Sequence, residues 1–242
     1  MVTELLVDMG NTRLKWRLQE QGVVQCSGAM LVSVLSLGQL QADLPESASV
    51  VYWASVASDE KGLCLENWAH QKNTPCHQMT TQDYWQDLSN GYQQPQQLGV
   101  DRWLAMVAAR QYTQKAVCVV DCGSAITFDY VSAGGLHEGS YIIPGARLMS
   151  QALARDTAQI NFTYQTLEDV QPGTSTAQAV LAGCSQMARY GAFGLVREAQ
   201  ERGYEILLCG GDGLVIANDL GLTYVEQLVL DGLAQVAGLH KH

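Results

Sequence analysis

Short apolar runs along the first eighty residues have the spacing of a mixed α/β sheet. Alternating or continuous apolar runs predict strands, and apolar residues three or four positions apart predict helices. The pair Gln21-Gly22 predicts a tight turn between the second and third runs. Three strands followed by alternating helices and strands favour a mixed sheet covered by helices. The expected strands cover residues 4–8, 14–18, 23–30, 50–56 and 76–79, and the expected helices cover residues 35–40 and 60–71.

A polar stretch follows this first pattern. Residues 82–97 are rich in glutamine and only weakly periodic, so they predict a long loop. Long loops in compact domains are usually either functional or disordered. A helix with an apolar side that carries Trp103 and Leu104 is then predicted to begin at Gly99-Val100-Asp101-Arg102.

The opening pattern recurs in the second half of the chain. The apolar run from Ala116 to Val120 ends at Asp121-Cys122-Gly123, just as the first run ends at Asp8-Met9-Gly10. In both copies an alternating strand and a turn follow. An internal repeat of this kind predicts two related halves. With a boundary near residues 112–116, we expect an N-terminal half at 1–114 and a C-terminal half at 115–242.

Composition narrows the classes of partner. The chain of 242 residues is 47% apolar and carries a net charge of -10, which is typical of a globular protein and disfavours nucleic acid and anionic membranes. Asp8 interrupts the first apolar run, and no run reaches the roughly 18 residues of a membrane span. We therefore expect neither a signal peptide nor a membrane anchor. The seven cysteines lack zinc-site spacing, which favours reduced thiols in a cytoplasmic protein.

The two Asp-x-Gly sequences are the first candidates for chemistry. One such sequence often marks only a turn, because glycine accepts a positive φ. A copy in each half, at the end of a buried strand, favours ligand binding, since strand ends carry the ligand sites of α/β sheets. Backbone N–H groups and the side chains of Asn11, Thr12 and Ser124 could then donate to phosphate oxygens. Because Asp8 and Asp121 would repel phosphate, they indicate a cation between them and the ligand.

Two further segments carry charged residues with alternative explanations. Lys15 is either a solvated strand residue or a point charge near phosphates. Asp101 is either a helix cap or a carboxylate that accepts a hydroxyl proton in phosphoryl transfer. Arg102 either pairs locally or forms a two-pronged contact with a substrate carboxylate.

Together these sequences resemble the type III pantothenate kinases, members of the actin, Hsp70 and sugar-kinase superfamily. The resemblance covers nearly the whole chain, in order. Its first phosphate motif, D-x-G-N-T-x-x-K, resembles residues 8–15, and its G-x-D-R motif resembles residues 99–102. The remaining matches are the tyrosine segment at Asn90-Gly91-Tyr92, the second phosphate motif at residues 121–125, the I-x-P-G turn at residues 142–145, Thr176, and the glycine pair Gly210-Gly211.

The resemblance implies a fold and a reaction. The fold would be two duplicated RNase H-like halves of the actin-like ATPase superfamily, with a cleft between them. The reaction would be phosphorylation of pantothenate by ATP, the first step of coenzyme A biosynthesis. The family requires magnesium and a monovalent cation, potassium or ammonium, and it forms homodimers whose substrate site lies close to the subunit interface.

The resemblance also implies roles for individual residues. Asp101 would be the general base, and Asp121 would hold the monovalent cation. ATP would be bound by Asp8, Met9, Gly10, Asn11, Thr12, Arg13, Leu14, Lys15 and Ser124. Pantothenate would be bound by Tyr92, Gly99, Val100, Asp101, Arg102 and Thr176. From its sequence position alone, Thr176 could instead be the cap of the helix that it opens.

The chain departs from the family pattern at two positions, and two alternative functions remain to be distinguished. Ser124 replaces the usual threonine, and Ser140 stands where a glycine commonly precedes the I-x-P-G turn. A regulator that binds a nucleotide without turnover is the main alternative. The acidic charge argues against direct DNA binding, and the presence of Asp8, Asp101 and Asp121 argues against lost catalysis. Another phosphotransferase of the superfamily, such as a sugar kinase or polyphosphatase, is the second.

Overall fold

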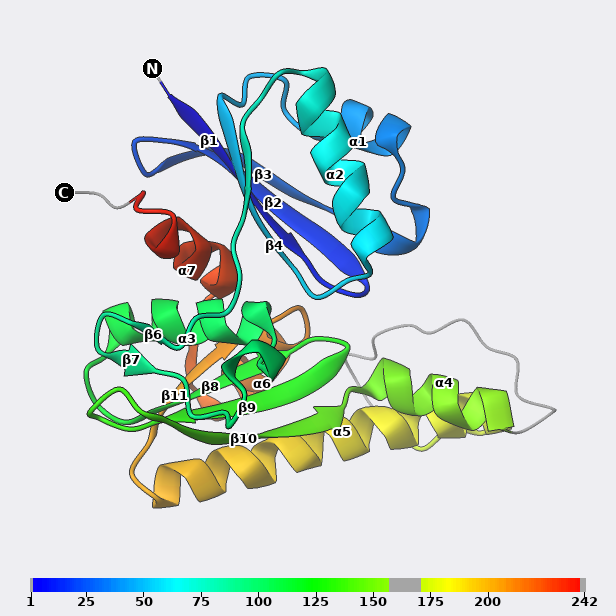
Figure 1. Cartoon of the computed structure of the whole chain (residues 1–242). Helices are drawn as coiled ribbons and strands as arrows, with labels where there is room; N and C mark the ends of the chain where they lie inside the picture. The colour runs from blue at the N-terminus through cyan, green and yellow to red at the C-terminus, as the bar shows by residue number, and fades with distance from the viewer. Residues whose placement is uncertain (1, 157–170, 240–242) are drawn as a thin grey trace. The chain divides into compact units, whose positions relative to one another are not determined.

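The computed structural model describes residues 2–156 and 171–239. These residues divide between two compact units, one with residues 2–112 and 227–239 and the other with residues 113–156 and 171–226. Each unit contains one five-stranded sheet with helices packed on it (Figure 1). Among the described residues, no helix combines the length and the apolar character needed to cross a bilayer.

The first unit contains the sheet predicted from the opening sequence. Its strand order is β3-β2-β1-β4-β5, with β1, β2 and β3 antiparallel and β1, β4 and β5 parallel. The predicted turn is confirmed, since Gln21 and Gly22 both have positive φ values, of 49° and 71°, which matches the twist of a two-residue hairpin. The elements are β1 (Thr3–Met9), β2 (Arg13–Glu20), β3 (Val23–Leu31), α1 (Leu37–Asp43), β4 (Val50–Ser55), α2 (Asp59–Gln71), β5 (Cys76–Gln78), β6 (Tyr84–Trp85), β7 (Leu88–Ser89), α3 (Val100–Tyr112) and α7 (Leu228–Val236).

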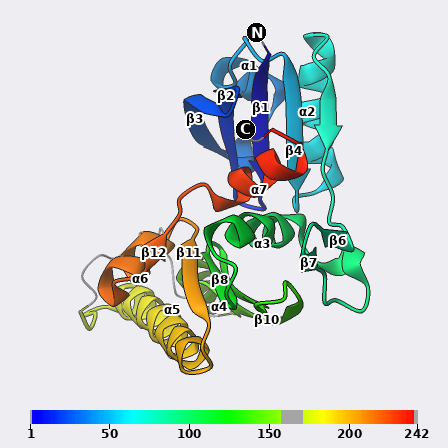
Figure 2. The same ribbon diagram turned by 90° about the vertical axis from the view of Figure 1, so that its left-hand side faces the viewer.

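Helices lie on both faces of this first sheet. On one face lie α1 and α2 (Figure 2), and their apolar residues form a core with Leu5, Val7 and Met9 of β1. On the other face, α7 packs on β1 and β4. Burial on both faces explains why β1 is a continuous apolar run rather than an alternating one.

The segment predicted as a long loop, residues 82–97, is more ordered than expected. It contains the two-stranded hairpin β6–β7 and a short 3₁₀ helix, Pro95–Gln97. An ion pair between Arg110 of α3 and Asp87 attaches the hairpin to α3, and only 2% of the Arg110 side chain is exposed. The prediction of an irregular loop was therefore wrong, because this hairpin depends on a tertiary ion pair rather than on a local apolar pattern.

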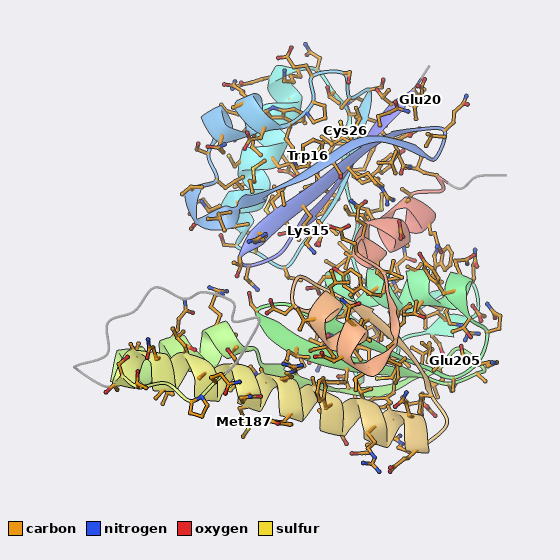
Figure 3. The ribbon with its side chains drawn as sticks, turned by 180° about the vertical axis from the view of Figure 1, so that it is seen from behind. Lys15, Trp16, Glu20, Cys26, Met187 and Glu205 are labelled. Carbon is orange, nitrogen blue, oxygen red and sulfur yellow. The ribbon has the colours of Figure 1, made fainter. Side chains whose placement is uncertain are left out.

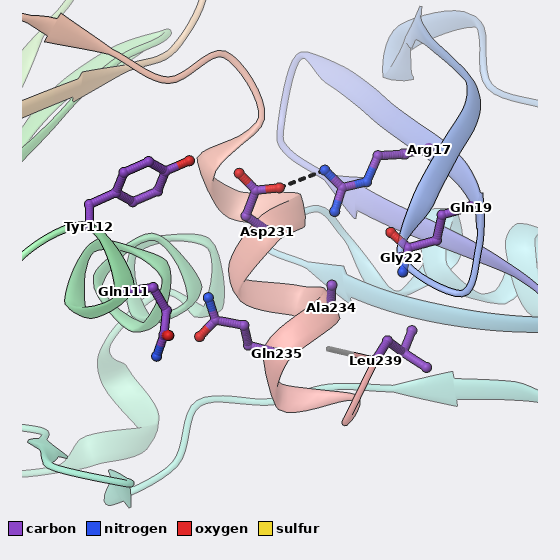
Figure 4. A pocket seen from close by; sticks show the side chains of 9 residues that line it. All are labelled: Arg17, Gln19, Gly22, Gln111, Tyr112, Asp231, Ala234, Gln235 and Leu239. Carbon is purple, nitrogen blue, oxygen red and sulfur yellow. Dashed lines mark hydrogen bonds and ion pairs between the residues drawn. The ribbon is translucent and has the colours of Figure 1, made fainter. Parts of the chain in front are cut away.

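The C-terminal helix α7 belongs to the first unit rather than to the second. Arg17 of β2 forms an ion pair of 2.6 Å with Asp231 (Figure 4). It also donates to the Leu230 carbonyl at 3.2 Å. Gly232 lies directly on the backbone of Leu104, where a side chain would collide. Residues 227–239 therefore belong to the first unit, whereas the sequence placed them in a C-terminal half that spans 115–242.

The same contact region borders a cavity of about 360 Å³. None of the residues predicted to bind ATP or pantothenate lines it. Its walls are formed by Arg17, Gln19, Gly22, Gln111, Tyr112, Asp231, Ala234, Gln235 and Leu239 (Figure 4).

The second unit repeats the strand order of the first. Its sheet runs β10-β9-β8-β11-β12, so that β8 takes the central position of β1. The predicted duplication is therefore confirmed. The elements are β8 (Val117–Cys122), β9 (Ala125–Val131), β10 (His137–Pro144), α4 (Ala146–Asp156), α5 (Thr176–Glu201), β11 (Glu205–Cys209), α6 (Gly213–Leu220) and β12 (Thr223–Tyr224).

Candidate active site

The first Asp-x-Gly sequence forms the turn between β1 and β2. Asp8 and Lys15 are direct cross-strand partners, which brings their Cβ atoms to within about 5.5 Å of each other. The Gly10 N–H donates to the Arg13 carbonyl at 3.0 Å and closes the turn. The predicted phosphate motif therefore has a carboxylate and an ammonium side by side at its base.

The residues of this motif differ in what they can offer a ligand. Asn11 and Arg13 are exposed and Thr12 is half-buried. Met9 and Leu14, by contrast, are fully buried in the core between the sheet and its helices. Any contact of Met9 or Leu14 with ATP would therefore use backbone atoms.

Asp101 lies in the first turn of α3. Its Oδ1 accepts a hydrogen bond of 2.8 Å from the N–H of Arg102. A Cβ atom added to Gly99 would come within 2.6 Å of the same oxygen. The absence of a side chain at Gly99 therefore makes room for the carboxylate proposed as the general base. Val100, between them, is buried and offers mainly its backbone.

Arg102 and Tyr92 form a pair, as their shared prediction as substrate residues requires. The Arg102 guanidinium donates to the Tyr92 hydroxyl at 2.9 Å and lies 5.6 Å from the centre of its ring. Arg102 is only 8% exposed, although it is charged. A buried guanidinium needs polar partners, so its position at the end of a polar tyrosine loop suits an anionic ligand.

Asn90 holds the tyrosine loop and was not predicted as a site residue. Its amide donates to the carbonyls of Gln82 at 3.3 Å and Pro95 at 3.2 Å, while its Oδ1 accepts from the Tyr92 N–H at 3.0 Å. Asparagine commonly bonds to the backbone two residues ahead. The Asn90-Gly91-Tyr92 sequence contained this signal, but the contacts to Gln82 and Pro95 are tertiary.

The second Asp-x-Gly sequence forms the equivalent turn between β8 and β9. The Gly123 N–H donates to the Ala125 carbonyl at 3.0 Å. Gly210 has a φ of +83°, and a side chain there would overlap the Asp121 carboxylate. The Asp212 N–H donates to the Cys122 carbonyl at 3.0 Å. The late glycine pair therefore lies against the second phosphate motif, within one unit.

Two carboxylates, those of Asp121 and Asp212, lie near the Cys122 thiol of this second turn. Burial raises the pKa of the Cys122 thiol, and the charges of Asp121 and Asp212 raise that pKa further. The thiol is consequently neutral and unsuited to act as a nucleophile. Two carboxylates at one strand end suit a nearby cation, although among the described residues no three His, Cys, Asp or Glu side chains gather as a metal-binding group.

Thr176 is the exposed first residue of α5, and the proposal that it caps this helix is wrong. The cap is Ser175, whose hydroxyl accepts from the Gln178 N–H at 3.3 Å.

Ser140, which stands where the family commonly has a glycine, pairs regularly with Asp129 of β9. The positive φ of +125° falls on the preceding residue, Gly139. Serine is tolerated at position 140 because the unusual backbone is one residue earlier.

The predicted residues thus form three local groups. Asp8 adjoins Lys15, and Asp101 adjoins Arg102 and Tyr92, in the first unit. In the second unit Asp121, Ser124 and Gly210 share one strand end. The cleft predicted between the halves stays a prediction.

Comparisons with known proteins address the family directly. The type III pantothenate kinase family profile matches residues 4–201. A type III pantothenate kinase of Hahella chejuensis is 36% identical over 236 residues, which cover 97% of each chain. One of Pseudomonas aeruginosa is 35% identical over an alignment of 249 positions, which covers 97% of this chain and 98% of the relative.

Solved structures agree on the fold. A Campylobacter jejuni protein described as belonging to the Baf family of transcriptional activators superposes with a TM-score of 0.59 at 23% identity, over 97% of each chain. The activator of 2-hydroxyisocaproyl-CoA dehydratase from Clostridium difficile superposes with a TM-score of 0.50 at 9% identity, over 98% of this chain and 94% of its own. These likenesses agree with the predicted α/β fold, and the repeated strand order of the two sheets shows its two related halves. With the family match over most of its length, the chain belongs to the type III pantothenate kinase family.

Proposed function

We propose that this protein transfers the γ-phosphoryl group of ATP to the hydroxyl of pantothenate, forming 4′-phosphopantothenate for coenzyme A biosynthesis. The observation that carries the proposal is Asp101. Its carboxylate lies at the start of α3, beside an arginine that is bonded to a tyrosine hydroxyl. A proton acceptor next to an anion-binding group is the arrangement that an alcohol substrate with a carboxylate requires.

Asp101 accepts the proton of the attacking hydroxyl. A bond forms between the hydroxyl oxygen and the γ-phosphorus, the bond from that phosphorus to the bridging oxygen breaks, and ADP departs. Phosphoryl transfer has a loose transition state with little early proton removal, so orientation of the hydroxyl matters as much as basicity. Arg102 binds the pantothenate carboxylate, and Tyr92 extends the same polar surface.

ATP is bound by the two strand-end turns. In the first, Asn11 and Thr12 donate side-chain hydrogen bonds, Gly10 permits close approach of the backbone, and Lys15 supplies a positive charge. In the second turn, the Ser124 hydroxyl donates a hydrogen bond to a phosphate oxygen. The exposure of Asn11 and the half-burial of Thr12 and Ser124 support this role, because each side chain can reach a ligand.

Cations complete the charge balance. Asp8 is the carboxylate that would hold magnesium, and magnesium would neutralise the phosphate oxygens during transfer. Asp121 would hold potassium or ammonium, and the carboxylate of Asp212, which like Asp121 lies near the Cys122 thiol, supports a cation at this strand end. Replacement of both ions by sodium should depress the rate sharply, whereas equal rates in all three salts would remove this role from Asp121.

The protein acts as a cytoplasmic homodimer, and Thr176 contacts pantothenate bound mainly by the neighbouring subunit. Support comes from α5, where Met187 and Tyr190 are 67% and 66% exposed. Figure 3 labels Met187 on this helix. Ala179 and Gly183 continue the same exposed side of the helix. A stripe of small and apolar residues allows close helix packing and suits a symmetric interface.

The regulator hypothesis is not favoured. The chain retains the candidate base and both strand-end carboxylates, and the two relatives at 36% and 35% identity are named as kinases. The deciding assay follows ADP formation by the purified protein with ATP and magnesium. ADP should form only when pantothenate is added, and no ADP with pantothenate, or equal ADP without it, would refute the proposal.

A further inference from the structure

Arg147 contacts the second phosphate motif although its sequence position gives it no predicted role. Its Nη2 donates a hydrogen bond of 2.8 Å to the Oγ of Ser124, 23 residues earlier in the chain. Both residues belong to the second unit, and both are half-buried. The contact is charge-assisted, and hydrogen bonds of that kind are roughly twice as strong as neutral ones.

The backbone holds Arg147 next to this turn. The Gly145 N–H donates to the Ser124 carbonyl at 3.0 Å. A Cβ atom on Gly145 would come within 2.7 Å of that oxygen and 2.8 Å of the Gly123 oxygen. The glycine therefore lets the end of β10 lie on the motif, and Arg147 follows two residues later in the first turn of α4.

The dipole of α4 does not favour an arginine at position 147. Positive side chains are disfavoured near a helix N-terminus, where the helix dipole is itself positive. The first turn of α4 contains no acidic residue that would offset Arg147. The charge-assisted contact with Ser124 is an interaction that offsets this unfavourable position of the guanidinium.

The hydrogen bond restricts what the Ser124 hydroxyl can do. A serine hydroxyl has one proton to donate and two lone pairs, whereas a guanidinium only donates. Because Arg147 donates to one lone pair of the Ser124 oxygen, the hydroxyl proton of Ser124 points away from the guanidinium and toward a different acceptor. The family's usual threonine is stiff at χ1 because it is β-branched, whereas serine lacks that restraint.

We propose that Arg147 is a positioning residue, which holds the Ser124 hydroxyl in the rotamer that donates to a phosphate oxygen of ATP. It thereby replaces the restraint that a threonine methyl group would supply. The inference rests on the proposed contact between Ser124 and ATP. It adds a residue and explains how the chain accommodates its departure from the family motif.

A double-mutant cycle tests the proposal by calorimetric titration of magnesium ATP without pantothenate. The four proteins are the wild type, Arg147→Met, Ser124→Thr and the double variant. Arg147→Met should raise the ATP dissociation constant roughly tenfold when Ser124 is present, as expected for loss of a charge-assisted hydrogen bond. In the Ser124→Thr background the same change should raise it no more than about threefold, because the χ1 restraint is then intrinsic.

Controls separate this role from a general effect. Arg155→Met removes an exposed arginine from the same helix and should leave ATP binding unchanged. Thermal melting verifies that each variant is folded, and Arg147→Lys, which keeps the charge but not the planar fork, should give an intermediate loss in the serine background.

The outcomes distinguish this inference from the proposed function. Equal losses in both backgrounds would show that Arg147 acts on the nucleotide by charge, and no loss in the serine background would show that it does nothing; either result overturns positioning. If the wild type binds ATP but does not phosphorylate pantothenate, the proposed substrate is refuted. The double-mutant cycle can still be measured, because it follows ATP binding alone. A folded wild type without ATP binding overturns both.

Discussion

Gly99 and Asp101 show how a single missing side chain can control a candidate catalytic group. The Asp101 Oδ1 occupies the space where a Cβ atom on residue 99 would lie. The backbone at Gly99 does not need a positive φ, so an alanine there is compatible with the fold but not with the present carboxylate position. The G-x-D-R sequence is thus explained by space rather than by backbone conformation.

Gly99→Ala should therefore reduce turnover while leaving the protein folded. Displacement of a reacting group by about 1 Å can reduce the rate about 10²-fold, so we expect kcat to fall ten- to a hundredfold with little change in melting temperature. Gly38→Ala is the matched control, because nothing lies within 4 Å of its added Cβ. Wild-type turnover in Gly99→Ala would show that the position of Asp101 does not matter.

Arg102→Ala should weaken pantothenate far more than ATP. Loss of a hydrogen bond to a charged group costs about 1.5–3 kcal/mol, which is roughly a ten- to hundredfold rise in the apparent pantothenate constant. Arg102→Lys should recover only part of the loss, since an ammonium lacks the planar fork. Steady-state kinetics with each substrate varied in turn measure both constants, and a shift confined to ATP would place Arg102 in the nucleotide site.

Sequence patterns identified the residues at strand ends but not the arginines that form tertiary hydrogen bonds with the predicted motifs and loops. Asp8 and Asp121 were found because a local apolar run ends at each of them. Arg147 and Arg110 were missed because their partners, Ser124 and Asp87, lie 23 residues away in the sequence. No local periodicity reports a tertiary hydrogen bond, so the roles of the predicted site residues themselves stay predictions.

At the scale of elements, repeated strands were easier to predict than polar or C-terminal segments. The two copies of the opening hairpin follow from alternation and turn residues, and both are observed as β1–β2 and β8–β9. The β6–β7 hairpin has strands of two residues each, too short for a periodic signal. The attachment of α7 to the first unit depends on Arg17 and Gly232. The roles of these two residues are visible only from their tertiary contacts, with Asp231 and Leu104, and not from the local sequence.

Asp231→Ala should detach α7 in part and lower the stability of the first unit. The Arg17 side chain is 7% exposed, so loss of its partner leaves a charge that is nearly out of water. Breaking a buried pair costs about 3–5 kcal/mol; because 29% of the Asp231 side chain is exposed, we expect a loss on the order of 2 kcal/mol in the free energy of unfolding.

Glu46→Ala provides the comparison for this element. It removes the Lys72–Glu46 pair, in which 82% of the Glu46 side chain is exposed, and exposed pairs contribute at most about 1 kcal/mol. Urea unfolding curves of the two variants measure the difference. Equal midpoints would mean that the Arg17–Asp231 contact does not hold α7 in place.

At the scale of the whole molecule, the exposed stripe on α5 raises the question of assembly. Ala179, Gly183, Met187 and Tyr190 lie on an exposed side of this helix, where apolar side chains are costly to leave in water. Thr176 opens the same helix without capping it, which leaves its hydroxyl available for a role other than that of Ser175. A shared site across two subunits would use that position.

A mixed dimer of Asp101→Asn and Thr176→Ala subunits tests the shared site. If Thr176 acts on the neighbouring subunit's substrate, the heterodimer contains one site with both defects and one with neither. About half of one wild-type dimer's activity should then return when two inactive proteins are mixed and heterodimers are isolated. Heterodimers without activity would assign Thr176 to its own subunit or remove it from the site.

The most direct measurement of the central claim compares the wild type with Asp101→Asn, with mass spectrometry of the products formed from ATP and pantothenate. The wild type should form 4′-phosphopantothenate and ADP in equal amounts. Asp101→Asn should bind ATP normally and form the product about 10²–10⁴-fold more slowly, the range typical of general-base removal. The lower end is expected if little proton transfer occurs in the transition state. A folded Asp101→Asn protein with wild-type turnover, or a wild type that forms no phosphorylated pantothenate, would contradict the account.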